Sequence, residues 1–331
     1  MVDVSPAPPE KYVLPLLYDA NGDMFINDVG QQAWEEINRG VRGGNYGWPS
    51  TEGSTSNPNF VSPVYAYDHQ EDRCAITGGN VGGAGFTING TGGTLNLGAG
   101  RTHTFSGNWT STAGTLNGGS STLNIGGTCS AATATFTAGA GTVNWNAAGA
   151  QTVCQYAYYN LTLSNSGVKT MTGVTSIGNN LTISGTATMT GNAAFTVAGA
   201  FDYSSSGTTT LTAASAISIG SYNQSAGTLI DNGNTITVTG SGASTWSQSG
   251  GVFTPTGTVI FTGAAPQVGA ANFNNLAINV GAGNTATLTG DGTVGNVLTL
   301  TSGIVTTGTN TLTVTSSCST GVSGGAAASY V

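Results

Sequence analysis

The chain has 331 residues, of which only 6% are charged, and a formal net charge of −8 at pH 7. Soluble domains are usually about 25% charged, so hydroxyl and amide side chains must keep this protein hydrated. Six Lys and Arg residues are too few for a surface that binds nucleic acid. No stretch approaches the roughly 18 apolar residues of a membrane-spanning helix. Composition therefore predicts neither a nucleic-acid partner nor a membrane span.

The ionic residues are concentrated at the start of the chain. Eleven of the 14 acidic residues and four of the six basic residues precede Ile76. Beyond that point the ionic side chains are those of Arg101, Lys169, Asp202, Asp231 and Asp291. The change in composition predicts two units, residues 1–81 and residues 82–331.

The first unit carries four motifs in a fixed order. They are Asp28-Val-Gly-Gln-Gln-Ala-Trp-Glu-Glu-Ile-Asn38, Gly43-Gly-Asn-Tyr-Gly-Trp-Pro49-Ser-Thr-Glu-Gly, Pro63-Val-Tyr-Ala-Tyr-Asp-His69 and Ala75-Ile-Thr-Gly-Gly79. Over about residues 12–81 they resemble the soluble quinoprotein glucose/sorbosone dehydrogenase family, whose members are six-bladed β-propellers that oxidise sugars with pyrroloquinoline quinone and calcium. The resemblance implies an incomplete propeller of about one and a half blades.

The same resemblance implies positions for the cofactors. The carbonyls of Gly30 and Gln31 fall where the family holds the catalytic calcium beside the quinone, and Glu36 and the Tyr46 carbonyl fall where some members hold a second calcium. Trp34 and Trp48 are expected to be blade core. The family's base histidine lies upstream of this region, and its quinone-contacting Arg-Asn-Pro element is missing from residues 6–17. We therefore expect no catalytic residues, no cofactor for this chain and no quinone-dependent activity. A PQQ-dependent sugar dehydrogenase is expected only from a longer chain.

The second unit is predicted to consist of short strands. Segments such as Leu161-Thr-Leu, Leu181-Thr-Ile and Thr311-Leu-Thr-Val alternate apolar and hydroxyl residues, so one face is buried and the other is wet. The Gly, Asn and Ser clusters between them supply the conformations that tight turns need.

A long internal repeat runs through these strands. Gly141-Thr-Val-Asn-Trp recurs as Gly257-Thr-Val-Ile-Phe, Asn160-Leu-Thr-Leu as Asn275-Leu-Ala-Ile, and Gly178-Asn-Asn-Leu-Thr-Ile as Gly295-Asn-Val-Leu-Thr-Leu. Shorter Gly-Thr-Leu and Gly-Thr-Val phrases indicate coils of roughly 20 to 30 residues. Such coils must stack to bury a core.

The predicted class is all-β: a right-handed parallel β-helix (β-solenoid) preceded by an incomplete β-propeller fragment. A string of small β-sandwiches is the alternative, although no domain linkers interrupt the pattern. In a solenoid, turn asparagines such as Asn160, Asn180 and Asn275 and the threonines on outward faces would form ladders that bond along the axis. Residues 82–331 also resemble the β-strand repeat regions of large secreted and cell-surface bacterial proteins.

Sequence offers little support for catalysis in the solenoid. It has no Glu after Glu71, and Asp202 and Asp231 are expected to be solvated turn residues and not a catalytic pair. Gly321-Val-Ser323-Gly-Gly matches G-x-S-x-G, but no His follows it. The glycine-rich Gly281-Ala-Gly-Asn-Thr-Ala lacks the strand-helix setting of a nucleotide fingerprint.

Cysteines and aromatic residues leave alternatives open. Cys129 and Cys154 lie 25 positions apart, so they either form a disulfide between adjacent coils or are buried thiols. The aromatic side chains either stack on sugars or form core stacks; they are Trp109, Trp145, Trp246, Tyr156, Tyr158 and Tyr159.

These features predict an extracellular structural or adhesive β-solenoid that carries a catalytically incomplete dehydrogenase-like fragment. Carbohydrates or cell-surface polymers are the expected partners, and the cell exterior or surface is the expected location, although the first residues do not resemble a signal peptide. The alternative is part of a secreted PQQ- and calcium-dependent glucose/sorbosone dehydrogenase with a β-repeat carbohydrate-binding or anchoring region.

Overall fold

The computed structural model describes residues 16–18, 24–28, 33–68, 86–88, 93–190, 194–212, 216–316, 321–324 and 329–330. All regular elements in these ranges are β-strands, which confirms the predicted all-β class. The described residues include no helix of the length and apolarity that a membrane crossing requires.

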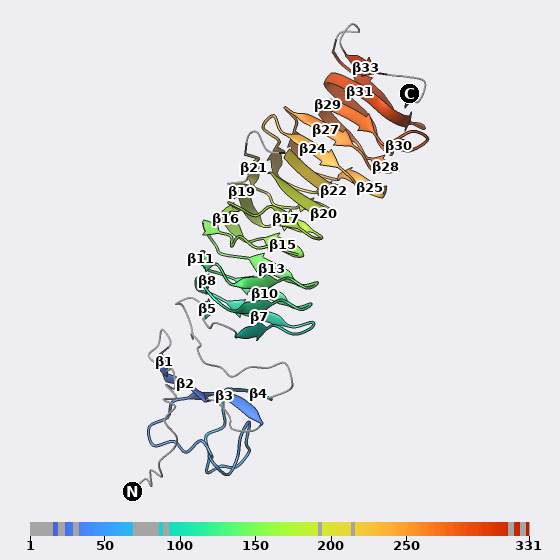
Figure 1. Cartoon of the computed structure of the whole chain (residues 1–331). Coiled ribbons are helices and arrows are strands. Elements are labelled where there is room, and N and C mark those ends of the chain that lie inside the picture. Colours follow the sequence, from blue (N-terminus) through green and yellow to red (C-terminus); the bar gives the residue numbers. More distant parts are fainter. Residues whose placement is uncertain are drawn as a thin grey trace.

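The first unit contains a four-stranded antiparallel sheet in the order β1-β2-β3-β4 (Figure 1). Its strands are β1 (Leu16–Tyr18), β2 (Met24–Asp28), β3 (Trp34–Arg39) and β4 (Tyr65–Asp68). The prediction that Trp34 and Trp48 form its core is wrong, because 38% of Trp34 and 59% of Trp48 are exposed. The predicted boundary between residues 81 and 82 lies outside the described residues.

The second unit is a parallel β-solenoid of about 11 turns (Figure 1), which confirms the solenoid over the sandwich alternative. Each coil contributes up to three strands, one to each of three lengthwise faces, which we name A, B and C. Paired residues one coil apart are separated by between 17 positions, as for Thr258 and Asn275, and 26 positions, as for Gly303 and Ser329.

The strands divide among the faces as follows. Face A holds β7 (Thr102–Phe105), β10 (Thr122–Ile125), β13 (Thr142–Trp145), β15 (Asn160–Leu163), β18 (Leu181–Ile183), β25 (Gly242–Gln248), β28 (Pro266–Val268), β30 (Thr285–Leu288) and β34 (Ser329–Tyr330). Face B holds β5 (Phe86–Ile88), β8 (Trp109–Ser111), β11 (Cys129–Ala132), β14 (Gln151–Thr152), β16 (Ser166–Thr170), β19 (Thr186–Thr190), β21 (Thr208–Thr210), β23 (Thr228–Ile230), β26 (Val252–Thr254) and β32 (Leu312–Val314). Face C holds β6 (Thr94–Asn96), β9 (Thr115–Asn117), β12 (Thr135–Thr137), β17 (Ser176–Ile177), β24 (Thr235–Val238), β27 (Thr258–Phe261) and β33 (Val322–Gly324).

Four long strands turn a corner between faces. β20 (Phe195–Tyr203) and β22 (Ala216–Gln224) pass from face C to face A, β29 (Ala271–Asn279) passes from B to C, and β31 (Gly292–Thr306) runs over all three.

The core is a set of columns in which residues of successive coils stack in register. Val143, Leu161 and Leu181 pair in order on face A, and each is at most 4% exposed. Period-two alternation places these side chains inside and the intervening Thr and Asn side chains outside.

The long sequence repeat is a stack of three coils that occurs twice on different faces. Its second copy, Val259, Leu276 and Leu298, pairs in the same order, but on face C. The two copies are about 116 residues apart. Six coils of about 20 residues would lead back to the same face, and the offset ends one face before that point. The same sequence can therefore build either face of the solenoid.

Glycines form one corner between faces C and A. Gly98, Gly119 and Gly139 have positive φ angles of 72°, 57° and 59°. A Cβ atom on Gly139 would lie only 2.2 Å from the Gly119 carbonyl oxygen of the previous coil. The close approach of the coils therefore requires glycine here.

Candidate functional site

The calcium positions implied by the family resemblance are only partly described. Gly30 and Gln31 lie outside the described residues. Glu36 is buried, and its carboxylate accepts hydrogen bonds from the Gly53 N–H and from Asn38 Nδ2, the latter at 3.2 Å. The side chain of Tyr46 is also bonded within this unit. Its hydroxyl accepts a hydrogen bond from the Val41 N–H at 2.8 Å and donates one to the Arg39 carbonyl at 3.1 Å.

Glu36 is thus held by one donor of its own strand and one of the loop between β3 and β4, and this does not fit an open calcium ligand. The described residues contain no group of three His, Cys, Asp or Glu side chains that could hold a metal ion. The calcium and quinone sites therefore remain predictions.

Sequence reasoning missed a buried polar region in the same sheet. Asn27 and Glu35 are completely buried, and the side-chain amide of Asn27 has no hydrogen-bonding partner. Burial raises the pKa of Asp28, and the nearby carboxylates of Glu35 and Glu52 raise it further.

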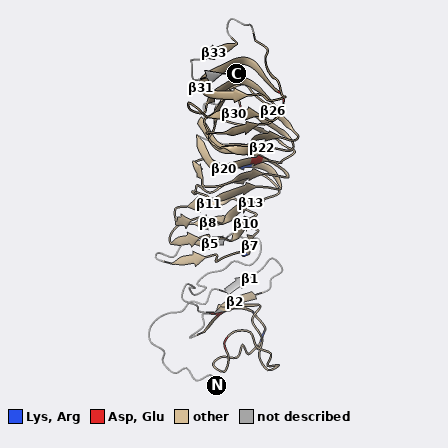
Figure 2. Ribbon diagram, turned by 90° about the vertical axis from the view of Figure 1, so that its right-hand side faces the viewer, with Lys and Arg blue, Asp and Glu red and all other residues tan. Residues whose placement is uncertain are grey.

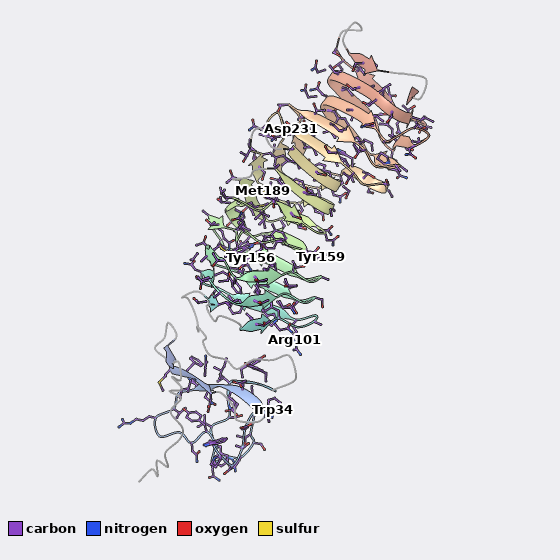
Figure 3. The ribbon with its side chains drawn as sticks, in the orientation of Figure 1. Trp34, Arg101, Tyr156, Tyr159, Met189 and Asp231 are labelled. Atoms are coloured by element: carbon purple, nitrogen blue, oxygen red, sulfur yellow. A yellow bond between two sulfur atoms is a disulfide. The ribbon has the colours of Figure 1, made fainter. Side chains whose placement is uncertain are left out.

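The large aromatic residues of the solenoid are core, so one of the two alternatives is confirmed. Trp109 and Trp145 are fully buried and Trp246 is 1% exposed. Trp246 packs against Tyr222 and Phe273, with ring centroids 4.5 Å and 5.3 Å away. Of the proposed sugar-stacking residues, only Tyr159 is exposed, at 36% of its surface (Figure 3).

The two aspartates considered as a catalytic pair have separate structural partners. Asp202 accepts a hydrogen bond from Asn223 Nδ2 at 2.7 Å, one coil later. Asp231 is fully buried, so the expectation that it is a solvated turn residue is wrong. Its carboxylate accepts bonds from the next coil, including the N–H groups of Thr256 at 2.7 Å and Gly257 at 3.0 Å.

The two short motifs also have structural roles. The Ser323 hydroxyl lies 3.0 Å from the Thr299 hydroxyl of the neighbouring coil, which is a stacked pair and not a nucleophile with its base. Gly281 has a φ angle of 89°, and its N–H donates to the Ser302 hydroxyl at 3.1 Å. It therefore belongs to a turn.

Lys169 is the only ionic side chain that points inward from face B among the described residues. It is fully buried, and Nζ donates to the carbonyls of Ala147 at 2.7 Å and Gly149 at 3.3 Å. Burial lowers its pKa from 10.5 to about 8. Because it is enclosed by the coil, its role is to satisfy these carbonyls.

Cys129 and Cys154 form a disulfide between adjacent coils on face B. This confirms the disulfide over the alternative of buried thiols.

The most regular exposed feature lies on face B, on the left-hand side of the solenoid in Figure 1. We call it the β-branched face. β16 and β19 each begin with one further outward residue, Ser166 and Thr186. On all five successive strands, two outward residues then flank one inward residue, and these ten flanking residues are β-branched. They are Val168 and Thr170 on β16, Thr188 and Thr190 on β19, Thr208 and Thr210 on β21, Thr228 and Ile230 on β23, and Val252 and Thr254 on β26.

Strand pairing arranges these residues in two columns. Val168 pairs with Thr188 and Thr170 with Thr190, and farther along Thr208 pairs with Thr228 and Thr210 with Ile230. Between the two groups, the Met189 N–H donates to the inward hydroxyl of Thr209 at 3.1 Å, which keeps β19 beside β21. Figure 3 labels Met189 at this point of the solenoid.

Sheet geometry sets the spacing of this face. Outward residues on one strand are about 6.6 Å apart, and hydrogen-bonded strands are about 4.8 Å apart. This strand spacing holds within two sheets, one that contains β16 and β19 and one that contains β21, β23 and β26. β-branched side chains have few χ1 rotamers, so their methyl and hydroxyl groups are held in nearly fixed positions. The result is an array of methyl and hydroxyl groups in two adjoining parts, one on β16 and β19 and the other on β21, β23 and β26.

The hydroxyl groups of this array are available to an external partner. None of its seven threonine hydroxyls bonds to another residue within the part of the chain that the structure describes. The amides on face A differ, because Asn144 Nδ2 donates to Asn124 Oδ1 at 3.0 Å and the Ser164 hydroxyl donates to Asn144 Oδ1 at 2.7 Å.

The asparagine ladders confirm one part of a sequence prediction. The other part, ladders of outward threonines, is wrong for the β-branched face, where the seven threonine hydroxyls are unbonded among the described residues. Asn179 Nδ2 donates to Asn160 Oδ1 at 2.9 Å, and Asn296 Nδ2 donates to Asn275 Oδ1 at 2.9 Å. The Ala200 N–H donates to Asn180 Oδ1, also at 2.9 Å. The β-branched face was not predicted, although the phrases Val168-Lys-Thr, Thr188-Met-Thr and Thr208-Thr-Thr recur every 20 residues and could have revealed it.

Figure 2 shows that almost the whole solenoid lacks charged side chains. An open groove of about 320 Å³ is lined by Gln248, Ser249, Asn272 and Asp291 among others. Asp291 is already engaged there, because it accepts a bond from the Thr311 N–H at 2.7 Å.

Comparison of the chain with protein-family models and with solved structures finds no match in either. The exposed side chains of the solenoid are therefore the basis for its proposed function.

Proposed function

We propose that the protein is an extracellular structural or adhesive solenoid and that the β-branched face is its contact surface. The single observation that carries this proposal is the presentation of ten rigid, uncharged side chains in register on a stack of coils. Repeat proteins commonly use such extended surfaces for binding. The unbonded threonine hydroxyls can donate to and accept from a solid polymer or cell-surface material.

Two further features support a location outside the cell. The disulfide between Cys129 and Cys154 is of a kind that persists in oxidising compartments and is rare in the cytosol. The resemblance of residues 82–331 to the β-strand repeat regions of secreted and cell-surface bacterial proteins also supports this location.

Adhesion can be tested with beads coated with the purified full chain. Retention under flow would be compared on cellulose, chitin, polystyrene and polycrystalline ice, with beads that carry the T190K/T210K double variant as the matched control. We expect the wild-type chain to exceed the variant on at least one surface. Equal retention of the two on every surface would contradict an adhesive role for this face.

A second candidate concerns only the first unit. Its four motifs support a dehydrogenase-like propeller fragment, and a four-stranded antiparallel sheet is the unit from which propeller blades are built. Carbohydrate as a partner of the whole protein follows from this candidate. Among the described residues, no tryptophan of the solenoid is exposed for stacking on a carbohydrate.

We expect the chain alone to be inactive, because the family's quinone-contacting Arg-Asn-Pro element is missing from residues 6–17. Dye reduction with added pyrroloquinoline quinone, calcium and glucose is the measurement. Turnover above that of the quinone alone would contradict this expectation.

A further inference from the structure

We propose that the β-branched face binds ice. This inference rests on the proposed adhesive function and names the partner of the same surface. It starts from the order of the face, in which the two outward residues that flank one inward residue on each of five successive strands are Thr, Val or Ile.

Charge and composition narrow the class of partner. No charged side chain projects outward from these five strands in the described residues, so no salt bridge can select a charged partner. No aromatic ring projects from them either, because Phe253 points inward and is 5% exposed. Proteins usually bind flat neutral polysaccharides by stacking aromatic rings on the sugars. The residues of this face therefore favour a partner that is recognised by hydroxyl and methyl groups alone.

Size argues against a protein partner. From the strand and residue spacings, the face covers on the order of 250 Å². A stable protein–protein interface buries about 800 Å² on each partner. A second copy of the chain docked through this face alone would therefore be held weakly.

Spacing favours a crystalline partner. Within each of its two sheets, the face repeats at about 4.8 Å along the solenoid axis and at about 6.6 Å along each strand. Water oxygens in hexagonal ice also repeat along two perpendicular crystal directions, and the shorter of these repeats is close to the spacing between strands. Stiff side chains keep the methyl and hydroxyl groups at these spacings without a further loss of rotamer freedom on binding.

The free hydroxyls complete the match. An ordered water layer needs hydroxyl groups that are not already bonded to the protein, and the seven threonines of this face provide them. Face A, whose outward amides bond to one another along the axis, does not offer such a surface. The proposed site is therefore confined to one side of the solenoid.

The test uses the fluorescently labelled full chain in a slowly growing ice hemisphere. We expect the wild-type protein to be incorporated into the ice and T190K/T210K to be excluded, because lysine adds length and strong hydration at the centre of the face. T162K/T182K is the matched control, since these two threonines pair on face A and are also partly exposed. It should be incorporated like the wild type.

Circular dichroism spectra of all three proteins establish that each is folded. Exclusion of the folded wild-type chain from ice would overturn the proposal, as would equal incorporation of T190K/T210K or equal loss in T162K/T182K. Retention on cellulose or chitin together with exclusion from ice would also overturn it, and would assign the face to a neutral polysaccharide while leaving the adhesive function intact. Concentration-dependent dimerisation that T190K/T210K abolishes, with no incorporation into ice, would assign the face to a second copy instead.

Discussion

The carboxylate of Asp231 accepts two hydrogen bonds from Thr256, one from its backbone N–H and one from its hydroxyl, both at 2.7 Å. Thr256 lies 25 residues later, so the carboxylate joins one coil to the next. The Gly257 N–H donates to the same carboxylate at 3.0 Å. Asp231, marked in Figure 3, is therefore a fully buried clamp between coils.

Removal of this clamp should destabilise the solenoid. We expect Asp231→Ala to lower the free energy of unfolding by about 3 kcal/mol, because buried N–H groups lose a charged acceptor. Urea unfolding followed by circular dichroism measures the change. Asp202→Ala is the control, since Asp202 is only partly buried and bonds to a single side chain, that of Asn223. A loss no larger than that of the control would contradict the clamp.

Lys169 should make stability depend on pH. Its pKa in the folded protein is about 8, below the ordinary 10.5, so the unfolded chain binds more protons between these values. The free energy of unfolding should therefore rise with pH above about 8, by up to about 1 kcal/mol per pH unit. Below pH 8 the buried amine is charged in the folded protein, so the full cost of burying the charge lowers the stability there.

Measurement between pH 7 and 9.5 isolates this effect, because burial raises the pKa of Tyr158 and Tyr222 and their ionisation on unfolding acts in the opposite direction at higher pH. Lys169→Met should abolish the rise. The same rise in the variant would assign the effect to other groups.

The corner glycines should be irreplaceable where coils touch. Gly139→Ala places a methyl group against the Gly119 carbonyl oxygen and also strains a positive φ angle. Gly308→Ala is the matched control, because Gly308 has a φ angle of 62° but no atom within 4 Å of the added carbon. We expect a loss of about 1 kcal/mol for the control and a clearly larger loss for Gly139→Ala in urea unfolding. Equal losses in the free energy of unfolding for the two variants would contradict a required close contact between coils at Gly139.

The disulfide between Cys129 and Cys154 should be present in the protein from its native source and should stabilise the coils that it joins. Mass spectrometry of unreduced peptides should detect the link. Reduction, or the C129S/C154S variant, should lower the free energy of unfolding by about 2 to 4 kcal/mol. Detection of free thiols at both positions in the native protein would argue against an oxidising compartment.

Several features were predictable from sequence because they depend on neighbouring residues. Alternation as in Leu161-Thr-Leu fixes which side chains are buried whatever the strand pairs with. Glycine and asparagine clusters set the turns, and the recurrence of Gly-Thr phrases indicated stacked coils. The asparagine ladders followed from stacking, since equivalent turn residues of successive coils must then meet.

The tertiary structure alone decided which residues become neighbours across coils. Coil length varies, so sequence could not place Thr256 beside Asp231, show that the repeat at Val259 builds a different face from the repeat at Val143, or align the outward residues of β16 to β26. Each of these relations depends on the number of residues in every intervening turn, summed around the solenoid. The same limit applies to the candidate site, because ten β-branched residues form a surface only when five coils bring them into register.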